Sequence, residues 1–298
     1  MVNFDSMKHI LIIILSIFAI PSAIAAVSGE QPDSLHAPSA KYQELIGKAD
    51  DAIKDSNWED AESFFLEAMR TEPGNPTNIL LMSNVGMLRH YAGKDSLALD
   101  MLDAAARMAP VSVTVKQNRA TVLTSLGRLE EAYDEYNRII GLDSTLAEPR
   151  FMRAMIDLKL GNVEKAESDV DYMLRNFPDE QDTWTAAAYT YIATARFADA
   201  IPYLSKIIEQ NPQPGDYGER ALCYLMTDNL PDASTDIAEA IRLDPLNGDF
   251  YLYRSLLNKR RYRPKEAADD ARKAAGLGVS ARKIASLGLY SDEKQQKR

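Results

Sequence analysis

The sequence predicts an all-α solenoid of about seven helix-turn-helix units. Three observations lead to this prediction: alanine recurs at nearly constant spacing, apolar residues follow each alanine at helical spacing, and proline follows most of these pairs. The intervals between the alanines are 37, 34, 34, 34, 33 and 34 residues. A constant period of this size is typical of stacked supersecondary units. The marker alanines are Ala61, Ala98, Ala132, Ala166, Ala200, Ala233 and Ala267.

Residues four and seven positions after each marker alanine are mostly apolar, as in Phe65 and Ala68 or Leu204 and Ile207. Offsets of four and seven lie on one face of a helix, so each unit has a helix that buries this stripe. The marker residue is small because only a methyl group lets two helix backbones approach closely.

Small residues also stand twelve positions before each marker, and they predict an earlier helix that contacts the later one. Glycine lies between the two helices at Gly93, Gly127 and Gly161, where it accepts the left-handed conformation that ends a helix. Proline lacks an amide hydrogen and disfavours helix in the preceding residue, so it ends a unit. The prolines are Pro73, Pro110, Pro178, Pro212 and Pro245.

This pattern resembles the tetratricopeptide repeat of roughly 34 residues. The fifth unit matches best, with Trp184, Ala188, Tyr191, Ala200 and Pro212 at the marked positions of the family. The resemblance implies a right-handed α-solenoid, or superhelix, over residues 42–281. It also implies a non-catalytic scaffold that binds a protein or peptide partner on the concave face, which the first helix of each unit mainly lines.

The groove positions of the family fall on a graded set of residues in this chain. The resemblance assigns the partner-binding groove to Gln117, Thr121, Thr124, Phe151, Met155, Leu158, Thr185, Ile192, Leu222, Leu225 and Met226. Two interpretations of the apolar members stay open at this point. They bind an apolar segment of a partner, or they are buried against the next unit.

The amino-terminal 25 residues have the pattern of a secretory signal peptide. Lys8 precedes an apolar run, and small residues end at Ala25, the expected cleavage site. Residues 26–41 then form a flexible tether, and the mature protein is periplasmic or secreted. One alternative is an uncleaved signal that tethers a structural adaptor to the membrane. Another is a protein that binds a small ligand or a glycan.

The carboxyl-terminal end is basic, whereas the rest of the chain is acidic. From Arg254 onward the residues carry a net charge of +8, against −10 for the whole chain. An acidic body disfavours nucleic acid as the partner. The basic end at Lys259, Arg260, Arg261 and Arg263 could contact anionic lipid headgroups or only keep the solenoid soluble. Residues 282–298 are expected to be a capping segment and a disordered tail.

The sequence predicts no enzymatic activity. Beyond the expected signal it contains only His36, His90 and Cys223 as histidine or cysteine, and it has no glycine-rich phosphate loop. These residues supply neither a nucleophile with its base nor a set of metal ligands at a recognised spacing. We therefore expect no catalytic residues, no metal and no cofactor.

Overall fold

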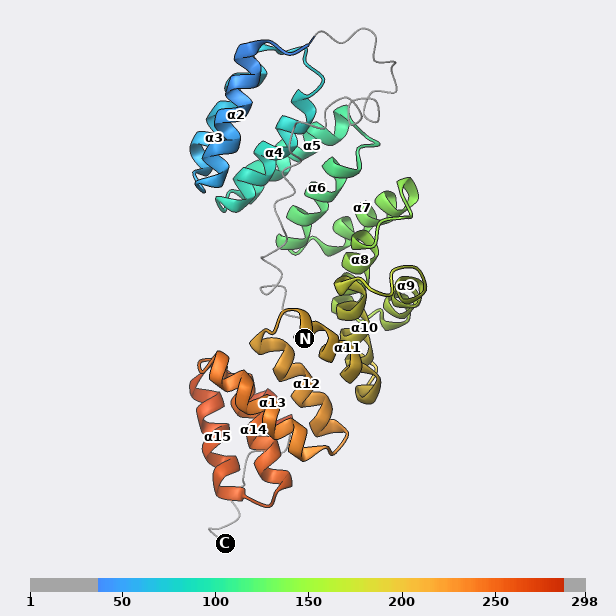
Figure 1. Cartoon of the computed structure of the whole chain (residues 1–298), viewed down its shortest axis with the longest axis vertical. Coiled ribbons are helices and arrows are strands. Elements are labelled where there is room, and N and C mark those ends of the chain that lie inside the picture. Colours follow the sequence, from blue (N-terminus) through green and yellow to red (C-terminus); the bar gives the residue numbers. More distant parts are fainter. Residues whose placement is uncertain (1–36, 287–298) are drawn as a thin grey trace. The chain divides into compact units, whose positions relative to one another are not determined.

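The computed structural model describes residues 37–286, which fold into helices without a strand, as the sequence predicts (Figure 1). Helices α2 to α15 alternate as first and second helices of seven hairpins, and a short helix follows them. The bounds are α2 Ala40–Lys54, α3 Trp58–Thr71, α4 Asn78–Tyr91, α5 Asp95–Met108, α6 Val113–Ser125, α7 Leu129–Leu142, α8 Glu148–Leu160, α9 Val163–Asn176, α10 Gln181–Ala193, α11 Phe197–Gln210, α12 Pro214–Met226, α13 Leu230–Leu243, α14 Gly248–Arg260, α15 Pro264–Gly276 and α16 Ala281–Ser286.

The described residues fall into two compact units, 37–156 and 157–286, with the division inside α8. Unit 1 contains α2 to α7 and most of α8, and unit 2 contains α9 to α16. The predicted signal peptide lies outside the described residues. The first helix begins at Ala40, inside the segment 26–41 that the sequence predicts to be a tether.

The marker alanines occupy the contact between the two helices of each hairpin. Six of them have no exposed surface, and Ala267 is buried as well. The apolar residues four positions later are buried beside them, as with Phe65, Leu102, Tyr136 and Leu204. Since a larger side chain at the marker would push the helices apart, the sequence periodicity reports a steric requirement of the packing.

Every turn between the helices of a hairpin contains one residue in the left-handed conformation. Glycine supplies it at Gly93, Gly127 and Gly161, with φ between 72° and 79°. At the other turns a residue other than glycine adopts the same conformation. These residues are Ser56, Ala195, Asp228 and Tyr262. The turn geometry is thus common to all seven hairpins even where glycine is absent, at some conformational cost.

Unit 1 buries a core between its first two hairpins. Tyr42 and Leu45 of α2 pack with Phe65 of α3, and Leu81 and Val85 of α4 complete the cluster. The hydroxyl of Tyr42 donates to Oδ1 of Asn78 at 2.9 Å. This bond ties α2 to the start of α4, so it links consecutive hairpins through a buried polar contact.

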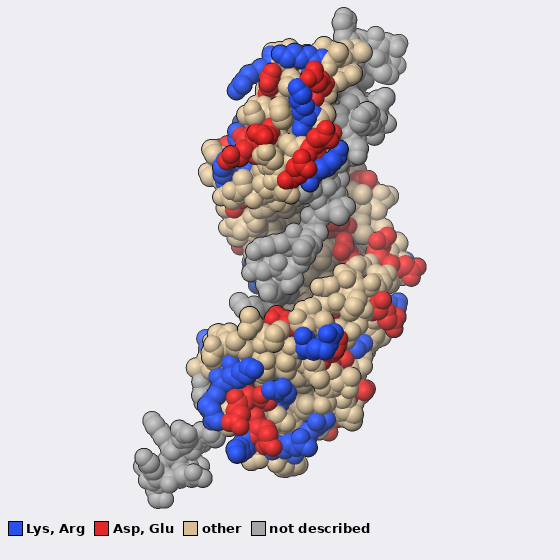
Figure 2. Space-filling model, turned by 60° about the vertical axis from the view of Figure 1, so that its left-hand side comes forward, with Lys and Arg blue, Asp and Glu red and all other residues tan. Residues whose placement is uncertain are grey.

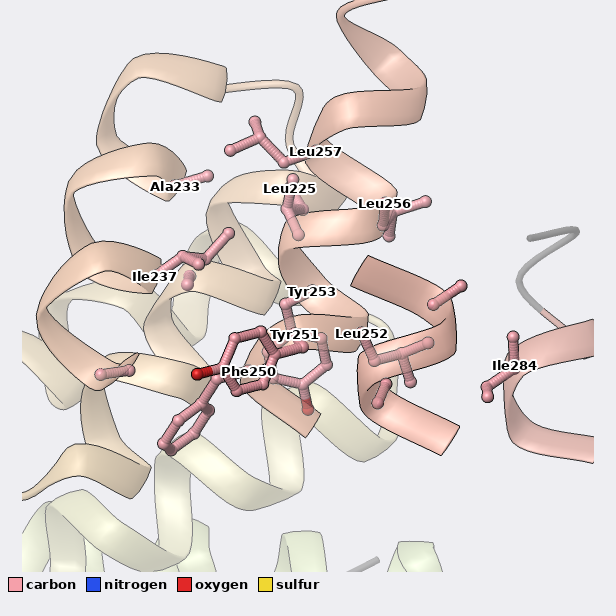
Figure 3. Packing of buried hydrophobic residues seen from close by; sticks show 14 residues of the cluster. Leu225, Ala233, Ile237, Phe250, Tyr251, Leu252, Tyr253, Leu256, Leu257 and Ile284 are labelled. Atoms are coloured by element: carbon pink, nitrogen blue, oxygen red, sulfur yellow. The ribbon is translucent and has the colours of Figure 1, made fainter. Parts of the chain in front are cut away.

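Unit 2 buries a large apolar cluster around α14. Phe250 and Tyr251 pack with Ile237 and Leu225 of the preceding hairpin (Figure 3). Leu252 belongs to the same cluster as Ile284, a buried residue of α16. Figure 3 shows Leu252 on the side of α14 that faces Ile284. The short helix α16 therefore covers apolar surface that the last hairpin would otherwise expose to water.

Candidate functional site

Unit 2 carries carboxylates on the first helices of its hairpins. Asp182 is on α10, Asp216 and Glu219 are on α12, and Asp249 is on α14. Asp182 and Asp249 stand eighteen residues before their marker alanines and Asp216 seventeen before its own, so they recur with the repeat. We call these four carboxylates the acidic face. Each of these residues is half-buried.

Two tyrosines accompany the acidic face. Tyr189 of α10 lies seven residues after Asp182, and Tyr253 of α14 lies four residues after Asp249, which places each pair on one side of its helix. Burial chiefly raises the pKa of Tyr189, and the neighbouring carboxylates Glu219 and Asp216 add to the shift. Tyr189 of α10 therefore lies near the carboxylates of α12.

The acidic face is poorly neutralised. Among the described residues, neither Asp182 nor Asp216 has an ion pair, and burial raises the pKa of both. The pKa of Asp216 rises to about 6. Burial also raises the pKa of Glu219, while Lys283 opposes the shift. Lys283 is already paired with Asp249, with Nζ 2.8 Å from Oδ1.

The carboxylates that follow the marker alanines on the second helices are paired in a different way. Arg220 donates to both oxygens of Asp236, and Arg254 donates to both oxygens of Asp270. In each pair the arginine comes from the first helix and the carboxylate lies sixteen residues later. Asp236 and Asp270 are thus neutralised within their own hairpins, whereas Asp182 and Asp216 of the acidic face have no ion pair among the described residues.

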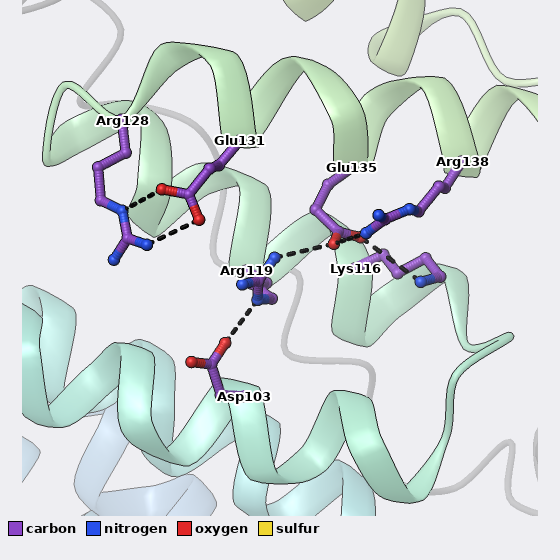
Figure 4. Close-up of polar contacts among 7 residues, drawn as sticks. All are labelled: Asp103, Lys116, Arg119, Arg128, Glu131, Glu135 and Arg138. Carbon is purple, nitrogen blue, oxygen red and sulfur yellow. Dashed lines mark hydrogen bonds and ion pairs between the residues drawn. The ribbon is translucent and has the colours of Figure 1, made fainter.

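Unit 1 has the same kind of pair and extends it into a network (Figure 4). Arg119 of α6 donates to Oδ1 of Asp103 at 2.6 Å and to Oε1 of Glu135 at 2.8 Å. Arg138 donates to the same Glu135 oxygen at 2.6 Å, and Lys116 lies 3.5 Å from the other one. Because Asp103, Arg119 and Glu135 belong to successive helices, the network fixes their register.

Exposed charges elsewhere are largely matched by neighbours of opposite sign, and Figure 2 shows Lys and Arg side chains interspersed with Asp and Glu on the face it presents. Examples are Lys48 with Glu44 at 2.6 Å and Arg242 with Glu239 at 2.6 Å. Such exposed pairs contribute little to stability. Asp182 and Asp216 of the acidic face, by contrast, have no ion pair among the described residues.

The first helices of unit 1 present polar side chains that bond to the protein itself. Asn118 of α6 donates to Oγ of Ser83 at 2.9 Å, which bridges α4 and α6. Gln117 donates to Oε2 of Glu148 at 2.6 Å. The hydroxyls of Thr121 and Thr124 donate to carbonyl oxygens of their own helix. The predicted polar groove residues Gln117, Thr121 and Thr124 are therefore half-buried, and each donates a hydrogen bond within the protein.

The predicted apolar groove divides into two groups. Phe151, Met155 and Leu225 are buried, with exposed fractions of 7%, 1% and 0%, which favours the second interpretation for them, burial against neighbouring residues. The neighbouring helices pack closely enough to cover them. The remaining predicted positions reach the surface: Leu158, Thr185, Ile192 and Leu222 are half-buried and Met226 is exposed.

Two of the four residues of the basic end, Arg260 and Arg261, form hydrogen bonds with the preceding hairpin. Arg260 donates to the carbonyl oxygen of Leu225 and lies 3.3 Å from a carboxylate oxygen of Asp228. Arg261 donates to the carbonyl oxygen of Leu230 at 3.0 Å. These two arginines bind the last hairpin to the one before it. Lys259 and Arg263 are exposed.

The described residues offer no arrangement typical of catalysis. They contain no group of His, Cys, Asp and Glu that could hold a metal ion. His90 lies 2.7 Å from Oδ1 of Asp95, across the turn between α4 and α5. Cys223 is buried, and burial raises the pKa of its thiol to about 12, so the reactive thiolate is disfavoured. Within residues 37–286, no helix combines the length and apolar character needed to span a bilayer.

Sequence reasoning missed the arginine pairs and the acidic face. The signal for the arginines was present, since Arg119, Arg220 and Arg254 each stand thirteen residues before a marker alanine. The acidic face was also periodic, but carboxylates at helical spacing are common on solvated surfaces. That Asp182 and Asp216 have no ion pair among the described residues could be seen only once the helices were placed in space.

Comparison with known proteins supports the repeat assignment. The family described as "Tetratricopeptide repeat" matches residues 151–213. A solved tetratricopeptide repeat protein from Parabacteroides merdae is similar over 84% of this chain and 99% of its own, with a TM-score of 0.65 and 26% identity. The described helices have the fold of tetratricopeptide repeat proteins, and residues 151–213 match that repeat in sequence.

Two curated relatives of this repeat protein are similar over shorter segments. DnaJ homolog subfamily C member 3 of Mus musculus is 26% identical over 176 residues, which are 54% of this chain and 35% of that protein. ER membrane protein complex subunit 2-A of Xenopus laevis is 28% identical over 120 residues, or 40% of each chain. The matches thus span about a third to two fifths of these relatives. The tetratricopeptide repeat fold is in general a scaffold for interactions between proteins.

Proposed function

We propose that this tetratricopeptide repeat protein is a non-catalytic adaptor of the cell envelope that binds a basic segment of a partner protein on the acidic face of unit 2. One observation carries the proposal: Asp182 and Asp216 are half-buried on the first helices and lack cationic partners among the described residues. Burying a carboxylate without a partner costs stability. A bound Lys or Arg side chain would recover that energy.

The arrangement also favours a particular kind of segment. The acidic residues recur on successive hairpins, so a peptide that lies across α10, α12 and α14 meets carboxylates along its length. Tyr189 supplies an aromatic face beside them, and aromatic rings attract cations as well. Opposite charge across an interface chiefly provides specificity and fast association. A segment with several spaced lysines or arginines fits this face best.

The alternative that the groove binds an apolar segment of a partner has less support. Leu225 and Leu252 have no exposed surface, so they offer nothing to such a partner. Leu222 is half-buried and adds apolar contact beside the carboxylates. We therefore assign it a supporting role in the binding of the basic segment.

A peptide-binding experiment tests the proposal. The affinity of the full chain for a fluorescent lysine-containing peptide is measured by anisotropy, with a glutamate-containing peptide as comparison. The triple variant Asp182→Asn, Asp216→Asn, Glu219→Gln should bind the basic peptide about tenfold more weakly, because three lost charge contacts of roughly 0.5 kcal/mol each sum to roughly 1.5 kcal/mol. Binding should also weaken at high salt.

The matched control is Glu209→Gln, which removes one negative charge from an exposed position on the second helix α11. It should leave the affinity unchanged. Equal binding of the basic peptide by the triple variant would eliminate the acidic face as the site. Placement in the envelope follows from the predicted signal peptide alone, and cell fractionation tests it: recovery of the protein in the cytoplasm would refute it.

A further inference from the structure

Among the described residues, Tyr262 is the most exposed of the large hydrophobic side chains. It occupies the turn between α14 and α15, and 93% of its surface is accessible. Its φ is +58°, in the left-handed region that three other turns fill with glycine. A tyrosine at this position keeps a ring in water at a conformational cost that glycine would avoid.

The residues around Tyr262 are cationic. Residues 259–266 contain five Lys or Arg and one acidic residue, Glu266. Arg263 and Lys265 are exposed and have no ion pair or hydrogen bond from their side chains among the described residues. Arg260 and Arg261 bond to the preceding hairpin, yet they still add positive charge beneath the turn.

From these features we propose that the turn formed by Tyr262, Arg263 and Lys265 docks on a membrane surface that contains anionic phospholipids. The free cations would contact lipid phosphates, and the tyrosine ring would enter the headgroup layer. Tyrosine is enriched at this depth of a bilayer because its ring is apolar and its hydroxyl is polar. Each Lys or Arg near an anionic membrane contributes roughly 1 kcal/mol of attraction.

A membrane fits this turn better than an acidic protein does. The ring of Tyr262 is exposed, so a protein partner would need a pocket that encloses the ring. A lipid headgroup layer accepts the ring without such a pocket. Charge complementarity and the unenclosed ring therefore favour lipid. The acidic face of unit 2 involves other residues, so this proposal and the proposed function can fail independently.

Vesicle co-sedimentation of the full chain tests the proposal. Vesicles of phosphatidylcholine with phosphatidylglycerol are compared with vesicles of phosphatidylcholine alone, at low and high salt. The amino-terminal apolar run would bind both kinds of vesicle equally, so the difference between them isolates the charged contact. We expect binding that requires phosphatidylglycerol and is lost at high salt.

Three variants locate the contact. Tyr262→Gly suits the left-handed backbone, so the fold is retained, and it should weaken the phosphatidylglycerol-dependent binding several-fold. Arg263→Gln and Lys265→Gln should each weaken it roughly fivefold. Arg242→Gln, which removes one positive charge from the exposed side of α13, is the matched control and should change nothing.

Several results would overturn the proposal. They are equal binding to both kinds of vesicle, absence of binding to either, and unchanged binding by the Tyr262, Arg263 and Lys265 variants. Capture of the chain by soluble polyglutamate through the same residues, without vesicle binding, would assign the turn to an acidic protein and would also overturn it.

Discussion

Arg220 donates two hydrogen bonds to Asp236, from Nε to Oδ2 at 2.7 Å and from Nη2 to Oδ1 at 2.9 Å. The arginine also donates to Oγ of Ser205 on the preceding second helix at 3.0 Å. One side chain thus joins three successive helices, α11, α12 and α13. Its fork of donors matches a carboxylate geometrically, which lysine at the same place would not.

The Arg220 pair should be important for the stability of unit 2. Replacing Arg220 with alanine leaves the Asp236 carboxylate, 6% exposed, without its partner. We expect a loss of about 3 kcal/mol in the free energy of unfolding, measured by urea titration monitored by circular dichroism. Arg242→Ala, in an exposed pair with Glu239, should change it by less than about 0.5 kcal/mol. Similar losses for both variants would contradict the special role of Arg220.

Enlarging a marker alanine should separate the helices of its hairpin. Ala200 is fully buried between α10 and α11, whereas Ala198 on the same second helix is exposed. Ala200→Leu should therefore cost about 1–3 kcal/mol through overpacking. Ala198→Leu, with the same added volume, should be nearly neutral. Thermal unfolding of the two variants gives the comparison, and a neutral Ala200→Leu would show that the small residue is not required there.

The acidic face should make stability depend on pH. The pKa of Asp216 is about 6 in the folded chain, above its ordinary value of 3.8, because burial penalises the carboxylate. Between these two values the folded state holds the proton more tightly, so the contribution of Asp216 to stability is greatest at low pH and falls as pH rises through 6. Asp216→Asn should therefore stabilise the chain at pH 8 by about 1–2 kcal/mol, after allowance for partial solvation.

Melting temperatures of the wild type and Asp216→Asn at pH 8 and near pH 4 test this sign. The difference between the two proteins should shrink at the lower pH, where the wild-type carboxyl is protonated. A stabilisation that persists unchanged at low pH would show that Asp216 is not a strained carboxylate. The same protonation should weaken the binding of a basic peptide below about pH 6.

The turn at Tyr262 offers a test of backbone strain. Tyr262→Gly should raise the free energy of unfolding by about 0.5–1 kcal/mol, because glycine adopts a φ of +58° without the steric cost that tyrosine meets. Tyr262→Ala removes the ring but keeps the Cβ atom, so it should give no such gain. Equal stabilities for the two variants, measured by urea titration, would contradict a backbone origin of the cost.

Some parts of the structure follow from local chemistry and were therefore predictable. A buried methyl group such as Ala132, the apolar residue four positions later and a left-handed turn at Gly127 each depend on the geometry of one hairpin. The resemblance of Trp184 and its neighbours to a known repeat led to the same hairpins. These features repeat because each unit meets the same steric requirement.

Other features depend on contacts between hairpins and could not be predicted reliably. Leu225 and Met155 stand at groove positions of the repeat, yet close packing of neighbouring helices buries them. Asp236 and Asp216 are equally acidic in the sequence, but one meets an arginine and the other does not. The difference arises from distances across helices, which residue types alone do not specify.

The sequence by itself determined that this protein is a series of helical hairpins, because a period of about 34 residues and the spacing of four and seven record the packing within each hairpin. The tertiary structure alone decided which side chains of the first helices stay accessible and which charges are neutralised. Exposure and electrostatic pairing depend on how closely neighbouring helices approach, and that approach is set jointly by side chains far apart in the chain.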